Sequence, residues 1–198
     1  MCLKSVYTLI LAMLLLVATH PSPAQTVPDG HQDDIPFAIG GGLSAFNPDF
    51  GNGILLGGTA WIDWSNTHGP WYLHGFGVEA EVADIAIGHS SNQPSNLREG
   101  SLGAGVTYTW RHFHDYHPYA KFLRSYSSID FHIPNVSYDH DTRTANIAGA
   151  GIEYRVTRGY WVRADYEYQW WPHLFDRTFT PEGLTVGVMY NFRHRHTQ

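Results

Sequence analysis

The segment 89–92 holds the residues best suited to covalent chemistry, His89, Ser91 and Asn92. A histidine two positions before a serine can accept the serine's proton and turn the hydroxyl into a nucleophile. A carboxylate must then orient the imidazole, and Glu99 is the nearest acid downstream. The surrounding serines, asparagines and proline, however, are typical of an ordinary polar loop. We therefore predict no catalytic residues, and keep nucleophilic catalysis by Ser91 as an alternative.

Histidines near two chain segments are the candidate metal ligands. They are His112, His114, His117, His194 and His196. Imidazoles at such spacing can bind a metal, but structural and catalytic sites usually add cysteines or carboxylates in a regular pattern. No such set accompanies these histidines, so we predict no metal and no cofactor.

Charged residues recur at alternate positions in several segments, which points to a shared interior. The set comprises Glu79, Glu81, Arg111, Lys121, Glu153, Arg155, Arg163, Asp165 and Glu167. Buried charges are costly unless they are paired. We expect these acids and bases to form a network of charged pairs that plugs the interior.

The segments that carry these charges alternate with period two, as the side chains of β-strands do. In the segment 160–171, Val162 and Ala164 share one face, and Arg163 and Asp165 share the other. Eight segments follow this pattern: 36–46, 53–64, 71–84, 102–111, 119–131, 145–156, 160–171 and 184–192. No helical periodicity occurs after residue 24, so the sequence predicts an all-β fold.

The connections between these segments alternate between short and long. The short ones are 65–69, 114–117 and 157–159, and the long polar ones are 88–100, 132–144 and 172–183. Only the first connection on the long-loop side, 47–52, is short. Barrels of bacterial outer membranes have short periplasmic turns and longer external loops.

Alternation alone does not decide which face is outside. A soluble secreted barrel would turn its apolar face inward around a ligand, whereas a membrane barrel turns it outward. The polar face is rich in glycine and mixed charge, as the narrow interior of an eight-stranded barrel requires. Arg124 is the exception, because it falls on the apolar face with Phe122 and Tyr126. We predict that the apolar face meets lipid.

Aromatic residues gather near the segment ends, as in the two belts found at bilayer interfaces. Near the short turns lie Trp64, Trp71, Tyr72, Trp110, Tyr119, Tyr160, Trp161, Tyr190 and Phe192. Near the long loops lie Phe46, Phe131, Trp170 and Trp171. We expect both groups to face the membrane interfaces.

The last segment, 184–192, resembles the terminal strand signal of outer-membrane β-barrel proteins. Thr185, Gly187, Tyr190 and Phe192 match its polar, glycine, hydrophobic and aromatic positions. The resemblance implies that the barrel assembly machinery recognises these residues. Phe192 is not the final residue, because a tail follows it.

The chain resembles the small outer-membrane β-barrel domain family, which includes the OmpA transmembrane domain and the Opa- and OmpX-like barrels. The resemblance rests on the segments 75–81, 118–121, 149–155 and 163–168, together with the last strand. The resemblance implies an eight-stranded antiparallel up-and-down transmembrane β-barrel over residues 36–192.

The first residues read as a signal peptide, residues 1–24, with Lys4 before an apolar stretch and small residues at 22–24. We expect a flexible lead-in at 25–35 and a periplasmic tail at 193–198. Removal of residues 1–24 lowers Lys plus Arg from 12 to 11 against 18 acids, so the mature charge is −7. This acidity does not favour nucleic acid as a partner.

The function expected from these observations is non-enzymatic. The protein would lie in outer-membrane lipid with both termini periplasmic, and its long loops would face outward toward an unknown ligand. Two alternatives stay open. The first is a lipid A deacylase-like outer-membrane enzyme, because the segment 89–92 resembles the H-x-S-N segment of these deacylases. The second is a soluble secreted ligand-binding β-barrel, whose strands would show the same alternation of apolar and polar residues.

Overall fold

A computed structural model describes residues 34–49, 53–66, 73–88, 96–111, 113, 115–132, 139–157, 159–174 and 177–193. The predicted signal peptide, nearly all of the lead-in, and the tail after Arg193 lie outside the described residues. Within the described ranges, no helix has the length and apolarity needed to cross a membrane.

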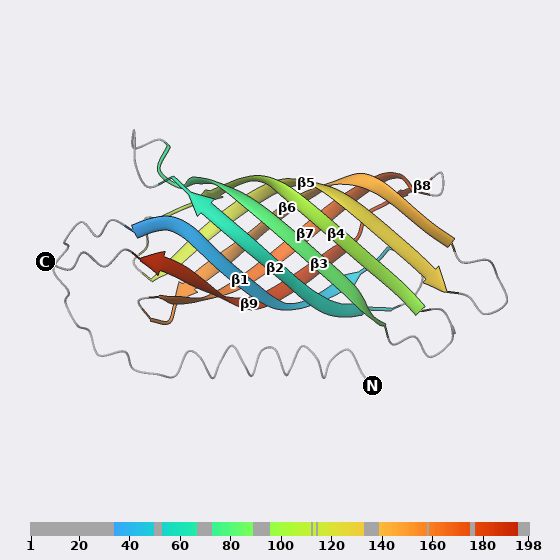
Figure 1. Cartoon of the computed structure of the whole chain (residues 1–198), viewed down its shortest axis with the longest axis horizontal. Helices are drawn as coiled ribbons and strands as arrows, with labels where there is room; N and C mark the ends of the chain where they lie inside the picture. The colour runs from blue at the N-terminus through green and yellow to red at the C-terminus, as the bar shows by residue number, and fades with distance from the viewer. Residues whose placement is uncertain are drawn as a thin grey trace, which may run out of the picture. The chain divides into compact units, whose positions relative to one another are not determined.

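Eight long antiparallel strands and one short strand make up the fold (Figure 1). The long strands are β1 (Asp34–Asn47), β2 (Leu55–Ser65), β3 (Phe76–Gly88), β4 (Asn96–Thr109), β5 (Tyr116–His132), β6 (Asp139–Arg155), β7 (Tyr160–Leu174) and β9 (Glu182–Arg193). Each long strand pairs with the next, and β9 pairs with both β7 and β1. This pairing closes the barrel and confirms the predicted eight-stranded up-and-down architecture.

The described strands extend further toward the long-loop end than the alternation predicted. Strand β5 ends at His132 and β6 begins at Asp139, so much of the predicted loop 132–144 is barrel wall. The short strand β8 (Arg177–Phe179) pairs with β7 inside the predicted loop 172–183. The added part of β6 is polar on both faces, with Asp141, Thr142, Arg143 and Thr144, so the alternation expected of a membrane strand does not reveal it.

The barrel is apolar outside and polar inside. Leu43 on β1 is 80% exposed, and Tyr126 on β5 is 63% exposed. By contrast, Arg163 on β7 is 1% exposed because it points into the lumen. A soluble ligand-binding barrel would show the reverse arrangement, so that alternative is excluded.

Four aromatic side chains predicted for the membrane belts lie inside the lumen instead. Tyr119 and Trp161 are buried near the short-turn end, and Phe46 and Trp171 near the long-loop end. Each sits at an inward position of its strand. The place of a residue in the alternation, and not its distance from the strand end, therefore decides whether its ring faces the lumen or the lipid. An outward belt does exist at the short-turn end, where Trp64, Trp110, Tyr160, Tyr190 and Phe192 are exposed.

Buried apolar clusters fill the lumen at both ends. Near the short turns, Ala38, Trp61, Trp161 and Met189 form one cluster. Near the long loops, Phe46, Leu55, Ala83 and Ile85 form a second, and Ile129, Ala145, Trp171 and Phe179 form a third. The charged residues therefore occupy a layer between apolar ends.

Candidate functional site

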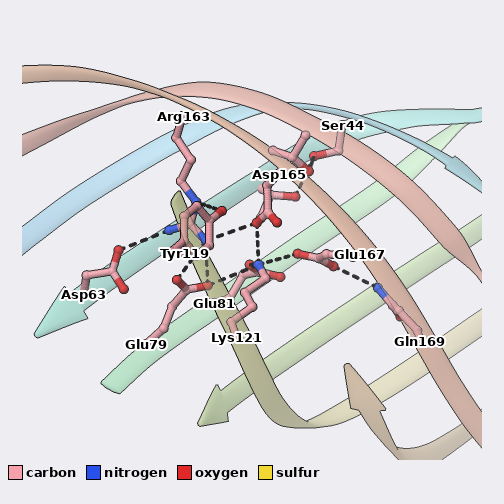
Figure 2. A network of polar contacts seen from close by, with 12 residues as sticks. Ser44, Asp63, Glu79, Glu81, Tyr119, Lys121, Arg163, Asp165, Glu167 and Gln169 are labelled. Atoms are coloured by element: carbon pink, nitrogen blue, oxygen red, sulfur yellow. Dashed lines mark hydrogen bonds and ion pairs between the residues drawn. The ribbon is translucent and has the colours of Figure 1, made fainter. Parts of the chain in front are cut away.

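Lys121 lies at the centre of the charged layer (Figure 2). Strand β5 points it inward, and β3 and β7 supply the acids around it. Its Nζ lies 2.5 Å from Glu81, 2.5 Å from Glu167, 2.6 Å from Asp165 and 3.2 Å from Glu79. Charge-assisted contacts of this length are strong. One buried ammonium thus holds four carboxylates from two strands.

Arg163 on β7 makes the second centre of the layer. Its Nη1 lies 3.1 Å from Asp63, and its Nη2 lies 2.8 Å from Glu79 and 3.1 Å from Asp165. The Nε donates to the Tyr119 hydroxyl at 2.5 Å. The guanidinium also lies over the Trp61 and Tyr119 rings, at 4.7 and 4.4 Å from their centroids. Cation–π contacts of this kind add to the ion pairs.

A chain of hydrogen bonds links the charged layer to the apolar cluster near the long loops. Gln169 donates from Nε2 to Glu167 at 3.3 Å. Trp171 then donates from Nε1 to the side-chain Oε1 of Gln169 at 2.8 Å. Figure 2 shows Gln169 beside Glu167. The indole of Trp171 therefore fills the lumen while its polar atom is satisfied, as buried indoles usually require.

The layer is net acidic in the described part of the lumen. Asp63, Glu79, Glu81, Glu153, Asp165 and Glu167 point inward, against the bases Lys121 and Arg163. Both bases therefore serve several carboxylates at once. Because buried charges need partners, loss of either base would leave acids uncompensated.

Three carboxylates of this layer lie close enough to hold a metal ion. The ligand atoms of Glu81, Asp165 and Glu167 all fall within 4.8 Å of one another. The Lys121 ammonium contacts all three, however, and takes the position that a cation would need. The three carboxylates therefore surround the lysine ammonium, which takes the place of a metal ion.

Two residues predicted for the network lie at its rim instead. Arg111 follows the end of β4 and donates to Ser65 Oγ at 2.7 Å. Arg155, the last residue of β6, pairs with Asp115 at 3.1 Å. Arg111 lies just beyond the end of its strand and Arg155 is the last residue of its own, so water reaches both side chains and neither joins the buried layer.

The other predicted network residues point inward. Glu153 is buried directly opposite Arg163 across the β6–β7 pair. The prediction missed Asp63, Tyr119 and Trp61 as members of the layer. Asp63 alternates between the outward residues Ile62 and Trp64, so the phase of its own strand contained the signal.

The residues of the terminal strand divide between the two faces of β9. Thr185 is buried and shares a hydrogen bond of 2.8 Å with Ser44. Gly187 faces inward beneath Trp61, where a Cβ would lie 2.7 Å from the indole. Tyr190 and Phe192 face outward, with ring centroids 5.1 Å apart.

Of the candidate catalytic residues, the structure describes only Glu99. His89, Ser91 and Asn92 lie outside the described residues. Glu99, the acid predicted to orient His89, is buried in the lumen opposite Ile85 and Ile129. It therefore points away from the lipid from which a deacylase takes its substrate.

Of the candidate metal ligands, only His117 is described. Its ring lies against Trp161, with centroids 4.7 Å apart. His112, His114, His194 and His196 lie outside the described residues.

Comparisons with known proteins point to one family. Residues 9–192 match the family described as outer membrane protein beta-barrel domain. A comparison with curated proteins gives no match.

Solved structures of small barrels share the fold. Neisserial surface protein A is 14% identical with a TM-score of 0.63, covering 79% of this chain and 97% of its own. Ail of Yersinia pestis is 18% identical with a TM-score of 0.53, covering 79% and 96%. OprG of Pseudomonas aeruginosa is 11% identical with a TM-score of 0.55, covering 83% and 99%.

Proposed function

Because the chain belongs to the outer membrane protein beta-barrel domain family, we propose that it is a non-enzymatic barrel of the bacterial outer membrane that interacts with the surroundings through its long loops. The observation that carries this proposal is the filled lumen. Charged pairs occupy its middle and buried aromatic residues occupy both ends. A barrel with a filled lumen can interact through its outer wall and its loops, but it has no wide pore for solutes.

The long connections are the part of the chain available for partners. Ail of Yersinia pestis has been crystallised with the heparin analogue sucrose octasulfate. In this chain, the segments 89–95 and 133–138 contain no lysine or arginine. The arginines of the predicted long connections lie in strands instead, and two of them have acidic partners: Arg98 pairs with Asp84, and Arg143 pairs with Asp141. Since little free positive charge is left for a sulfated polysaccharide, we propose an uncharged polar surface, of a glycan or a protein, as the partner of these loops.

The terminal strand supports the proposed route into the membrane. After export by the signal peptide, the barrel assembly machinery would recognise Thr185, Gly187, Tyr190 and Phe192, and both termini would stay periplasmic. Phe192→Ala should then lower the amount of folded protein in the outer membrane severalfold, while purified protein refolds in micelles as well as the wild type. Equal amounts in cells would count against recognition of this strand.

The orientation can be tested on intact cells. A protease site inserted between residues 133 and 138 should be cleaved by external protease, and the same site inserted after Arg193, where β9 ends, should be cleaved only once the outer membrane is permeabilised. Heat-modifiable migration on gels would show that both variants are folded. Cleavage of the second site in intact cells would overturn the proposed orientation.

A further inference from the structure

The side chain of Arg124 lies on the outer, lipid-facing side of the barrel. Arg124 on β5 sits between Phe122 and Tyr126, which are 51% and 63% exposed. Its Nη1 donates to Asn146 Oδ1 at 2.7 Å, and its Nη2 donates to Thr144 Oγ1 at 2.9 Å. Both partners are neutral side chains of the neighbouring strand β6.

Two acids of the outer face, further toward the long loops, have basic partners. Asp84 accepts two hydrogen bonds from Arg98, and Asp130 pairs with His140. Among the described residues, no carboxylate contacts Arg124. A charge on the lipid face is costly, so such residues usually find a counter-charge.

The position of Arg124 along its strand identifies the level of the bilayer it faces. Tyr116, near the short turns, and Tyr126 are outward residues of the same strand and are ten positions apart. At about 3.3 Å per residue and a tilt of about 40°, this span covers about 25 Å, the height of the apolar band of such barrels. Arg124, two positions before Tyr126, therefore lies about 5 Å inside the far edge of that band, within reach of the lipid headgroups.

We propose that Arg124, held by Asn146 and Thr144, binds a phosphate of a phosphorylated glycolipid in the outer leaflet. A guanidinium has five N–H donors in a planar fork that matches phosphate oxygens. Two are used within the protein, and this fixes the plane of the group and leaves other donors for the lipid. The exposed side chains of Phe122 and Leu102 provide apolar surface for the acyl chains.

This proposal rests on the long-loop end facing outward, but its test does not, because it uses purified protein. Native mass spectrometry of the protein in detergent would compare diphosphorylated lipid A with the same lipid stripped of its phosphates. The wild type should retain the phosphorylated form preferentially. Arg124→Ala should lower the bound fraction at least fivefold, and Arg124→Lys should retain part of it.

Arg155→Ala is the matched control, because it removes an arginine at the opposite end of the barrel. This variant should bind phosphorylated lipid as the wild type does. Heat-modifiable migration would establish that each variant is folded. Unchanged binding by Arg124→Ala, equal binding of the two lipids, or full competition by millimolar inorganic phosphate would overturn the proposal. None of these results would bear on the orientation of the loops, which the protease experiment tests separately.

Discussion

Lys121 is the residue on which the charged layer most depends, because its ammonium contacts four carboxylates. Arg163 cannot replace it, since its own donors already reach Asp63, Glu79, Asp165 and Tyr119. The stability of the barrel should therefore respond to Lys121 far more than to a cation at the rim.

Lys121→Met should destabilise the barrel by about 3–5 kcal/mol, the usual cost of removing one partner from a buried ion pair. Urea unfolding in lipid vesicles, followed by tryptophan fluorescence, would measure the change. Arg111→Met is the control, because Arg111 is exposed at the rim.

The triple variant Lys121→Met, Glu81→Gln and Glu167→Gln should recover part of the lost stability. It removes the two carboxylates that lie 2.5 Å from the ammonium. If Lys121→Met were as stable as Arg111→Met, the ion pairs would not support the lumen.

At the scale of elements, β9 closes the barrel against β1, and small residues allow the two strands to meet beneath Trp61. Gly42 lies opposite Gly187 across this pair. Space between β1 and β9 is short only on the inward side, where side chains fill the lumen. The outward positions of the two strands are open to lipid.

Gly187→Ala should destabilise the barrel by about 1–3 kcal/mol, the usual cost of an overpacked interior. Its new methyl group would lie 2.7 Å from the Trp61 ring and still closer to the Gly41 carbonyl oxygen. Gly41→Ala on the adjacent strand is the matched control, since the nearest atom to its Cβ is 3.6 Å away. Similar unfolding curves for the two variants would contradict this account of the seam.

Strand alternation predicted the barrel from the sequence well, because the outward faces of the long strands are mostly apolar and the inward faces carry the charged layer. The prediction of side-chain position from alternation was less accurate at strand ends. Arg111 and Arg155 continue the polar phase but lie at the rim, and Trp161 was assigned by position although its phase points inward. Strand β8 has three residues, too few for alternation to register. The partners of Lys121 depend on which strands lie across the lumen, and a single strand does not contain that information.

At the scale of the whole molecule, the lumen is closed in successive layers. An apolar cluster lies at the short-turn end, the ion pairs lie in the middle, and two further apolar clusters lie toward the long loops. An ion would have to pass every layer, so emptying one layer does not create a path.

In planar bilayers, the wild type should therefore show no steady conductance. The double variant Trp61→Ala and Trp161→Ala should also show none, because the charged layer and the apolar clusters near the long loops remain. A porin added to the same bilayer would serve as the positive control. Stable ohmic steps from the wild type would contradict the closed lumen.

The extension of β5 and β6 beyond Tyr126 sets the height, above the edge of the apolar band, at which the connection between these two strands begins. Six residues separate Tyr126 from the end of β5 at His132. At about 3.3 Å per residue and a tilt of about 40°, the wall rises about 15 Å above the edge of the apolar band. With the long-loop end outward, as proposed, the connection between β5 and β6 would begin about 15 Å beyond the edge of the apolar band, where a large external partner such as an antibody would meet it before the membrane.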